Sequence, residues 1–216
     1  MLYSIKKLTA FTILLAVTLT CVNMDSYAQK RSNNNGSYLK TSLNAYSFNT
    51  PLLKEKIMNL DQLLEYCAEK DIDGVDLTGY YFPGYPEVPS DEYLYHIKQK
   101  AFLLGVEISG TGVRNNFSSP DVNLRKEGVQ LVKDWIIAAE KLGASVVRVF
   151  SGESDLTGYT REQATEWMVK DLKECAEFGR QHGVIVGLQN HHDFLMTADH
   201  IIDVIEKVDH EWLGLI

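Results

Sequence analysis

The chain has 216 residues, of which 45% are hydrophobic and 23% are charged, and its formal net charge is −8. This length and apolar content suffice for one domain with a sizeable core. The negative charge argues against a nucleic-acid-binding groove, because such a groove needs a basic surface to neutralise phosphates.

The first residues have the order of a secretory signal peptide. Lys6 and Lys7 form a basic start, the stretch Leu8–Thr20 is uncharged and mostly apolar, and Ser26-Tyr27-Ala28 carries small residues at both key positions of a cleavage site. The apolar stretch is too short to span a bilayer, so we expect no membrane span after cleavage. We therefore predict a signal peptide over residues 1–28 and an exported protein, periplasmic or secreted.

A polar, asparagine-rich stretch follows, and we interpret residues 29–40 as a flexible lead-in to the folded domain. Cys21 raises the alternative of a lipoprotein, but Thr18-Leu19-Thr20 before it lacks the usual pattern. We therefore favour cleavage before Gln29 over lipidation.

From residue 41 onward, short apolar segments alternate with longer segments of helical period. This alternation predicts an α/β fold, and the continuously apolar strands favour a parallel sheet covered on both faces. The expected strands are Thr41–Phe48, Gly74–Thr78, Val106–Ser109, Ser145–Ser151, Val184–Asn190 and Trp212–Ile216.

The expected helices have clear start and stop signals. The first two are Leu60–Lys70 and Asp91–Leu104. The third follows the cap Ser119-Pro120 and ends at Gly143, and the fourth opens with a capping box at Thr160 and ends at Gly183. The fifth begins at about Thr197. A glycine after three of them predicts a left-handed turn back into the sheet. Cys67 and Cys175 occupy apolar helix positions, so we expect buried free thiols rather than a disulfide.

Periodicity does not separate a barrel from a doubly wound sheet. No Gly-x-Gly-x-x-Gly follows the first strand, which argues against dinucleotide binding. Polar residues gather after several strands, as the active site of a TIM barrel requires.

Four segments together resemble the xylose-isomerase-like family of sugar isomerases and epimerases. The stretch Val184–Phe194, with Gln189-Asn190-His191, resembles the fifth strand of that family, which ends in Glu-Asn-His. The segment Trp212–Ile216 resembles the sixth strand of the family. The segment Asp73–Leu77 resembles the second strand, and Gly143–Gly152 resembles the fourth strand. The resemblance covers residues 41–216 and implies a (β/α) TIM barrel of which about five and a half of eight units are present.

The resemblance also implies a divalent metal, Mn, Mg or Zn, bound by the glutamate that ends the fifth strand. Gln189 stands at that position, and an amide oxygen brings no charge, so weaker metal binding is expected. The sixth strand ends the chain, so the remaining ligands of the family are missing. We interpret the chain as a fragment of a longer product, and self-association into an oligomer is the alternative, because open sheet edges pair readily.

The resemblance implies proton transfer next to a sugar carbonyl, which needs a base and a group that polarises oxygen. Gln189 and His191 are two residues apart on one strand and therefore face the same way, whereas His192 faces the opposite side and is interpreted as structural. We predict His191, Asp76 and Glu153 as catalytic residues.

The expected substrate-binding residues are Arg148, Asn190, Arg114 and Tyr81. Arg148 lies between valines in a strand, where an unpaired charge is very unfavourable, so it needs Asp76, Glu153 or a substrate oxygen as a partner. Arg114 follows the third strand, and Tyr81 belongs to an aromatic loop suited to stacking on a sugar.

Three functions remain open. The first is a sugar isomerase or epimerase that acts on a small-molecule carbohydrate. The second is a lyase or hydratase that acts on keto-glycosides. The third is a sugar-binding module without catalysis, which Gln189 favours. An abasic-site endonuclease of the same barrel type is disfavoured by the acidic charge.

Overall fold

The structure is a computed structural model of the chain, and it describes residues 39–191 and 193–216. The predicted signal peptide, most of the predicted lead-in and His192 lie outside the described residues. The folded unit comprises Thr41–Ile216. None of the described helices is long and apolar enough to cross a membrane.

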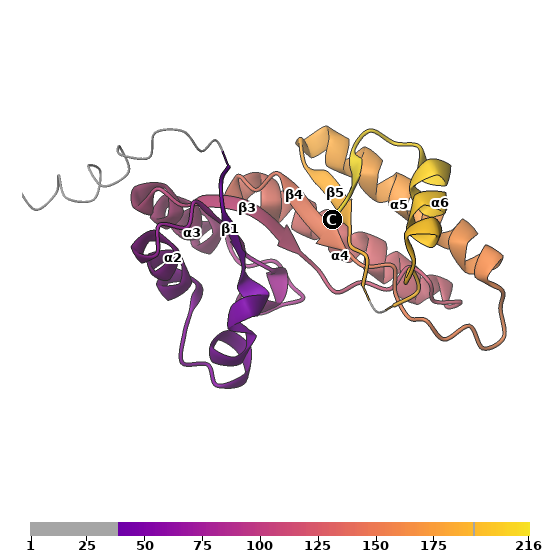
Figure 1. Cartoon of the computed structure of the whole chain (residues 1–216), viewed down its shortest axis with the longest axis horizontal. Helices are drawn as coiled ribbons and strands as arrows, with labels where there is room; N and C mark the ends of the chain where they lie inside the picture. The colour runs from indigo at the N-terminus through magenta and orange to yellow at the C-terminus, as the bar shows by residue number, and fades with distance from the viewer. Residues whose placement is uncertain (1–38, 192) are drawn as a thin grey trace, which may run out of the picture. The chain divides into compact units, whose positions relative to one another are not determined.

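The described unit contains one parallel sheet whose strands follow one another in chain order (Figure 1). The strands are β1 (Ser42–Asn44), β2 (Gly74–Asp76), β3 (Glu107–Gly112), β4 (Val146–Val149), β5 (Ile185–Leu188) and β6 (Leu213–Leu215). A doubly wound sheet would reverse its strand order at a switch point, and this sheet does not. The strand order therefore supports the barrel and argues against the doubly wound sheet. The described strands form an incomplete barrel, because β1 and β6 each pair with one neighbour only.

Helices connect the strands and pack against one another in sequence (Figure 1). They are α2 (Leu60–Glu69), α3 (Asp91–Leu104), α4 (Val122–Leu142), α5 (Arg161–His182) and α6 (Ala198–Val208), with the short helical turns η2 (Ala45–Phe48), η3 (Thr50–Lys54) and η4 (Gly79–Tyr81). The core lies between the sheet and these helices and includes Leu64, Ile97, Trp135, Met168 and Val186, all fully buried.

The predicted helix ends are confirmed. Gly105, Gly143 and Gly183 follow α3, α4 and α5 with φ of 66°, 80° and 67°, so each closes its helix in the left-handed conformation. Thr160 and Gln163 form the predicted capping box at the start of α5. Cys67 and Cys175 are free and buried, as predicted.

Several predicted boundaries were wrong, and β2, β4 and β5 each end two residues before the predicted position. The first strand ends at Asn44, because the Asn44 side chain accepts the N–H of Tyr46 and starts the turn η2. Helix α4 starts at Val122 with Asp121 as its cap, because the Ser119 hydroxyl accepts the N–H of Asp121 and holds a turn before the helix. The third strand continues to Gly112, beyond the predicted end at Ser109.

Candidate functional site

A cavity of about 1090 Å³ lies at the carboxyl ends of the strands, beside the first half of α4. Segments that follow β1, β2, β3, β4 and β5 all contribute to its wall, as in the active sites of TIM barrels. The predicted site residues in its lining are Arg148, Gln189, His191, Glu153 and Arg114. The chain thus brings five of the eight predicted residues to one cavity.

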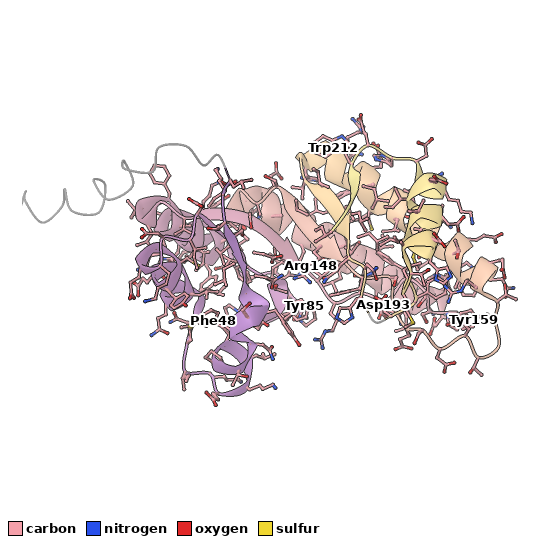
Figure 2. The ribbon with its side chains drawn as sticks, in the orientation of Figure 1. Phe48, Tyr85, Arg148, Tyr159, Asp193 and Trp212 are labelled. Carbon is pink, nitrogen blue, oxygen red and sulfur yellow. The ribbon has the colours of Figure 1, made fainter. Side chains whose placement is uncertain are left out.

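Arg148 is the buried charge at the floor of this cavity, with only 4% of its surface exposed (Figure 2). It is paired in register with Gly112 on β3 and with Gly187 on β5. A Cβ atom at Gly112 would lie 3.1 Å from the Arg148 side chain. Gly112 therefore leaves room for the guanidinium, whereas a Cβ atom at Gly187 would lie 2.3 Å from Ile216.

Three side chains from other strand ends hold the guanidinium. Arg148 Nη1 donates to Gln189 Oε1 at 2.9 Å and Nη2 donates to Thr78 Oγ1 at 2.9 Å. Its Nε lies 3.5 Å from Asp76 Oδ2 and forms an ion pair with that carboxylate. The Thr78 hydroxyl donates to Asp76 Oδ1 at 3.3 Å. A network of this kind compensates the desolvation of the charge and fixes its orientation.

Asp76 itself does not line the cavity. The register between β2 and β3 shifts after Val75, so that Asp76 lies opposite Gly110. It lies behind Arg148 and is engaged by both Arg148 and Thr78. This position suits a residue that orients the guanidinium, whereas the sequence predicted a catalytic role for Asp76.

Two asparagines brace the loops of the rim. Asn115 donates through Nδ2 to the Phe150 carbonyl at 2.7 Å and accepts the Phe150 N–H at 2.9 Å, which locks the end of β3 to the end of β4. Asn116 Oδ1 accepts the Ser118 hydroxyl at 3.1 Å and the Glu153 N–H at 3.4 Å. These contacts fix the loop that carries Glu153 at the cavity.

The groups suited to proton transfer lie above Arg148. Glu153 is exposed on the loop after β4, and His191 is exposed after β5, with its ring edge-on to Phe150 at 5.4 Å between centroids. Asp193 also lines the cavity, although sequence reasoning missed it (Figure 2). The signal for it was the same alternation that pairs Gln189 with His191.

Asp193 is half-buried, and its two carboxylate oxygens differ. Oδ1 accepts the N–H of Leu195 at 3.3 Å, whereas Oδ2 is buried without a hydrogen-bond partner among the described residues. A buried carboxylate oxygen that lacks a partner is unfavourable unless a ligand supplies one. Asp193 is therefore a candidate acceptor for a substrate proton or hydroxyl.

Two predicted binding residues lie elsewhere. Tyr81 donates its hydroxyl to Asn49 Oδ1 at 3.0 Å and is outside the cavity lining, and burial raises its pKa. Asn190 is exposed, also outside the lining, and its N–H donates to the Ile216 carbonyl. In the aromatic loop Tyr80 instead reaches the cavity, with the Arg114 guanidinium 5.3 Å from its ring centroid. The position of Tyr80 fits a cation–π contact.

The donor set does not fit a divalent metal. Gln189 Oε1, the atom expected to bind the metal, accepts a hydrogen bond from the positively charged Arg148. A second cation at this oxygen would be repelled by the guanidinium. Within residues 39–191 and 193–216, no three His, Cys, Asp or Glu side chains are grouped so that they could hold a metal ion.

The family model described as the xylose isomerase-like TIM barrel matches residues 42–216. The chain belongs to this family. No curated protein sequence matches the chain.

Several solved structures share the fold. The D-psicose 3-epimerase from Clostridium cellulolyticum H10, determined with D-tagatose, is 20% identical, with a TM-score of 0.67. The probable 3-DHS dehydratase AsbF from Bacillus anthracis is 20% identical, with a TM-score of 0.61. The IolI protein with a bound zinc atom is 18% identical, with a TM-score of 0.66. Each comparison covers 82% of this chain and 62% of the other, so the chain spans less than two thirds of these proteins.

Proposed function

We propose that this protein acts on a small-molecule carbohydrate as an isomerase or epimerase, by proton transfer at a carbon next to a carbonyl. The observation that carries the proposal is the buried Arg148 at the cavity floor, held by Asp76, Thr78 and Gln189. Further support comes from the family, since the similar structures include a sugar epimerase.

In this proposal Arg148 stabilises the negative charge that develops on the carbonyl oxygen. A guanidinium has five N–H donors, and the contacts to Asp76, Thr78 and Gln189 use three of them. The other two can donate to the substrate oxygen. Because the side chain is already oriented and desolvated, it stabilises the developing oxyanion without reorganisation.

His191, Glu153 and Asp193 are the proposed proton-transfer groups. They lie after β4 and β5 and line the same cavity as Arg148. Removal of a proton and its return to the same or the neighbouring carbon needs at least one such base within reach of the substrate. We assign this step to His191 and Glu153, and we assign Asp193 to a substrate hydroxyl.

The test is solvent exchange in D₂O. The full-length protein is incubated with D-psicose, D-tagatose and D-fructose, and proton NMR follows deuterium incorporation next to the carbonyl. We expect exchange with at least one ketose, reduced by about 10²-fold or more in His191→Asn or Glu153→Gln. Absence of exchange with every ketose, or full exchange in both variants, contradicts the proposal.

A lyase or dehydratase is the second candidate, because the dehydratase AsbF shares the fold and because elimination begins with the same proton abstraction. The same spectra distinguish the two. Elimination gives new alkene signals, whereas isomerisation only exchanges or inverts a C–H group.

We also propose that the protein works outside the cytoplasm, on the basis of the signal-peptide pattern over residues 1–28. Mass spectrometry of the native protein should find Gln29 at the N-terminus. An intact Met1 terminus in the cytoplasmic fraction contradicts export.

A further inference from the structure

The cavity continues beyond the residues assigned to proton transfer, along one face of α4. We call this part the outer lobe and define it by six lining residues: Tyr80, Pro86, Leu124, Glu127, Leu131 and Asp134. The four from α4 recur at intervals of three or four positions, so they share one face of the helix. Arg114 lines the same cavity, with its guanidinium 5.3 Å from the centroid of the Tyr80 ring.

The outer lobe combines apolar surface with hydrogen-bond acceptors. Leu124 and Leu131 offer aliphatic surface, while Glu127 and Asp134 carry carboxylates, and Asp134 Oδ1 accepts the Gln130 side chain at 2.8 Å. Gly128 lies between them, is buried and packs against Phe117 and Asn115, so the α4 face is held against the loop after β3. A ring with one apolar face and hydroxyl donors at its edge matches such a surface, because carboxylates accept from hydroxyls and the aliphatic groups exclude water.

The size of the cavity gives an independent argument. Its volume of about 1090 Å³ slightly exceeds the usual range of about 300 to 1,000 Å³ for pockets that hold small ligands. One monosaccharide ring at Arg148 fills only part of it and leaves the outer lobe to water. The cavity has room for a second ring there.

We infer that the substrate is a glycoside of two rings, whose reacting ring lies at Arg148 and whose second ring rests on the outer lobe. The inference rests on the proposed function. The second ring is either another sugar or an aryl group, since both present a flat apolar face to Leu124 and Leu131. The hydroxyls of a second sugar would in addition use Glu127 and Asp134.

Calorimetric titration with one-ring and two-ring probes tests the inference. D-fructose is compared with the ketose disaccharides lactulose, turanose and isomaltulose, and methyl β-D-glucopyranoside is compared with phenyl β-D-glucopyranoside, which probes the aryl ring by binding alone because it has no free carbonyl. We expect at least one two-ring probe to bind the full-length protein about tenfold more tightly than its one-ring reference. Tighter binding of a disaccharide identifies a second sugar, and tighter binding of the phenyl glycoside identifies an aryl group.

Leu124→Ser provides the site-specific control, with Val122→Ser as its match. Leu124 is 50% exposed and Val122 is 49% exposed on the same helix, but Val122 lines a separate groove between α4 and α5. Leu124→Ser should weaken the two-ring probe about fivefold and leave D-fructose unchanged, because it removes apolar contact in the outer lobe alone. Val122→Ser should change neither the affinity for the two-ring probe nor the affinity for D-fructose.

Equal affinity for one-ring and two-ring probes overturns the inference and leaves the proposed function intact. An equal loss in Leu124→Ser and Val122→Ser also overturns it. If no probe binds and no ketose exchanges deuterium, the proposed function fails first, and the inference falls with it.

Discussion

The buried Arg148 and the half-buried Arg125 have similar ion pairs but different surroundings. The Arg148 side chain is 5% exposed and lies 3.5 Å from Asp76, and the Arg125 side chain is 12% exposed and lies 3.3 Å from Asp171. Arg148 lies at the carboxyl ends of the strands, whereas Arg125 lies between α4 and α5. Burial and pairing alone therefore do not distinguish a functional arginine from a structural one.

The remaining contacts distinguish them. Arg148 is held by Thr78 and Gln189 from other strand ends, and it shares its cavity with His191 and Glu153. Arg125 stacks 4.6 Å from the Trp167 ring and donates through Nη1 to the Ser119 carbonyl. Arg148 also lies 5.6 Å from the centroid of the Phe150 ring, so a ring contact alone does not distinguish the two arginines. The contact to backbone ties Arg125 to the start of its helix, whereas a cation among acid–base groups can act on a substrate.

The largest expected change in stability comes from Arg125→Met. It leaves the buried Asp171 carboxylate without its partner, so we expect a loss of about 3 kcal/mol in the free energy of unfolding. Denaturant unfolding measures this loss, and sugar binding by the folded variant should be unchanged. A stability within about 0.5 kcal/mol of the wild type contradicts a structural ion pair.

The same variant has a definite pH dependence. Burial already raises the pKa of Asp171, and Arg125 opposes that rise. Without Arg125 the folded-state pKa rises further above the unfolded value, so the charged carboxylate destabilises the fold at neutral pH. The loss in the free energy of unfolding of Arg125→Met, relative to wild type, should decrease as the pH falls through this raised pKa, because the folded state binds the proton more tightly than the unfolded state does. Asp171→Asn in the same background should remove the pH dependence.

A smaller effect is expected at the loop that carries Glu153. Gly152 has φ of 118°, and a Cβ atom there would lie 2.2 Å from Asn116 Oδ1, which holds the Glu153 N–H. Gly152→Ala should therefore cost about 2 kcal/mol through backbone strain and lost hydrogen bonds. Gly158→Ala is the matched control, since its φ is 88° with nothing within 4 Å, and should cost about 1 kcal/mol. Equal melting temperatures for the two variants would show that Asn116 does not brace the loop.

The smallest effect is expected from Gln189→Glu. A carboxylate at this position puts a charge on the acceptor as well as on the Arg148 donor and so adds an ion pair to the hydrogen bond, and we expect a gain of about 1 kcal/mol in stability. Thermal unfolding in EDTA measures the gain without any metal. A gain that appears only with Mn²⁺ would instead assign residue 189 to a metal site.

Much of the fold could be predicted because its signals are local. Gly143 and Gly183 end their helices where the sequence indicated, and the Thr160 capping box needs only residues within one turn. The end of β3 could not be predicted, because Gly110 and Gly112 look like a turn in sequence. Their lack of side chains is instead required by neighbours distant in the chain, Val146 and Arg148.

The candidate site likewise contains features that could be predicted from the sequence and features that could not. Residues at or after the ends of consecutive strands, such as Arg148 within β4 and His191 after β5, could be placed at one edge because parallel strands end together. The hydrogen bond from Arg148 to Gln189 and the position of Tyr81 beside Asn49 depend on side-chain packing between distant segments. Asp193 was missed because it follows the strand in an irregular segment, where alternation is a weaker guide.

The central claim is that Arg148, and not Arg125, performs the chemistry. The most direct test is the rate of deuterium exchange in D₂O for Arg148→Lys and Arg125→Lys, each measured on protein shown to be folded. Lysine keeps the charge but lacks the planar fork, and its three N–H donors leave none for the substrate if they contact Asp76, Thr78 and Gln189. We predict a loss of about 100-fold or more in Arg148→Lys and a rate within about twofold of wild type in Arg125→Lys. Equal rates in the two variants would contradict the account.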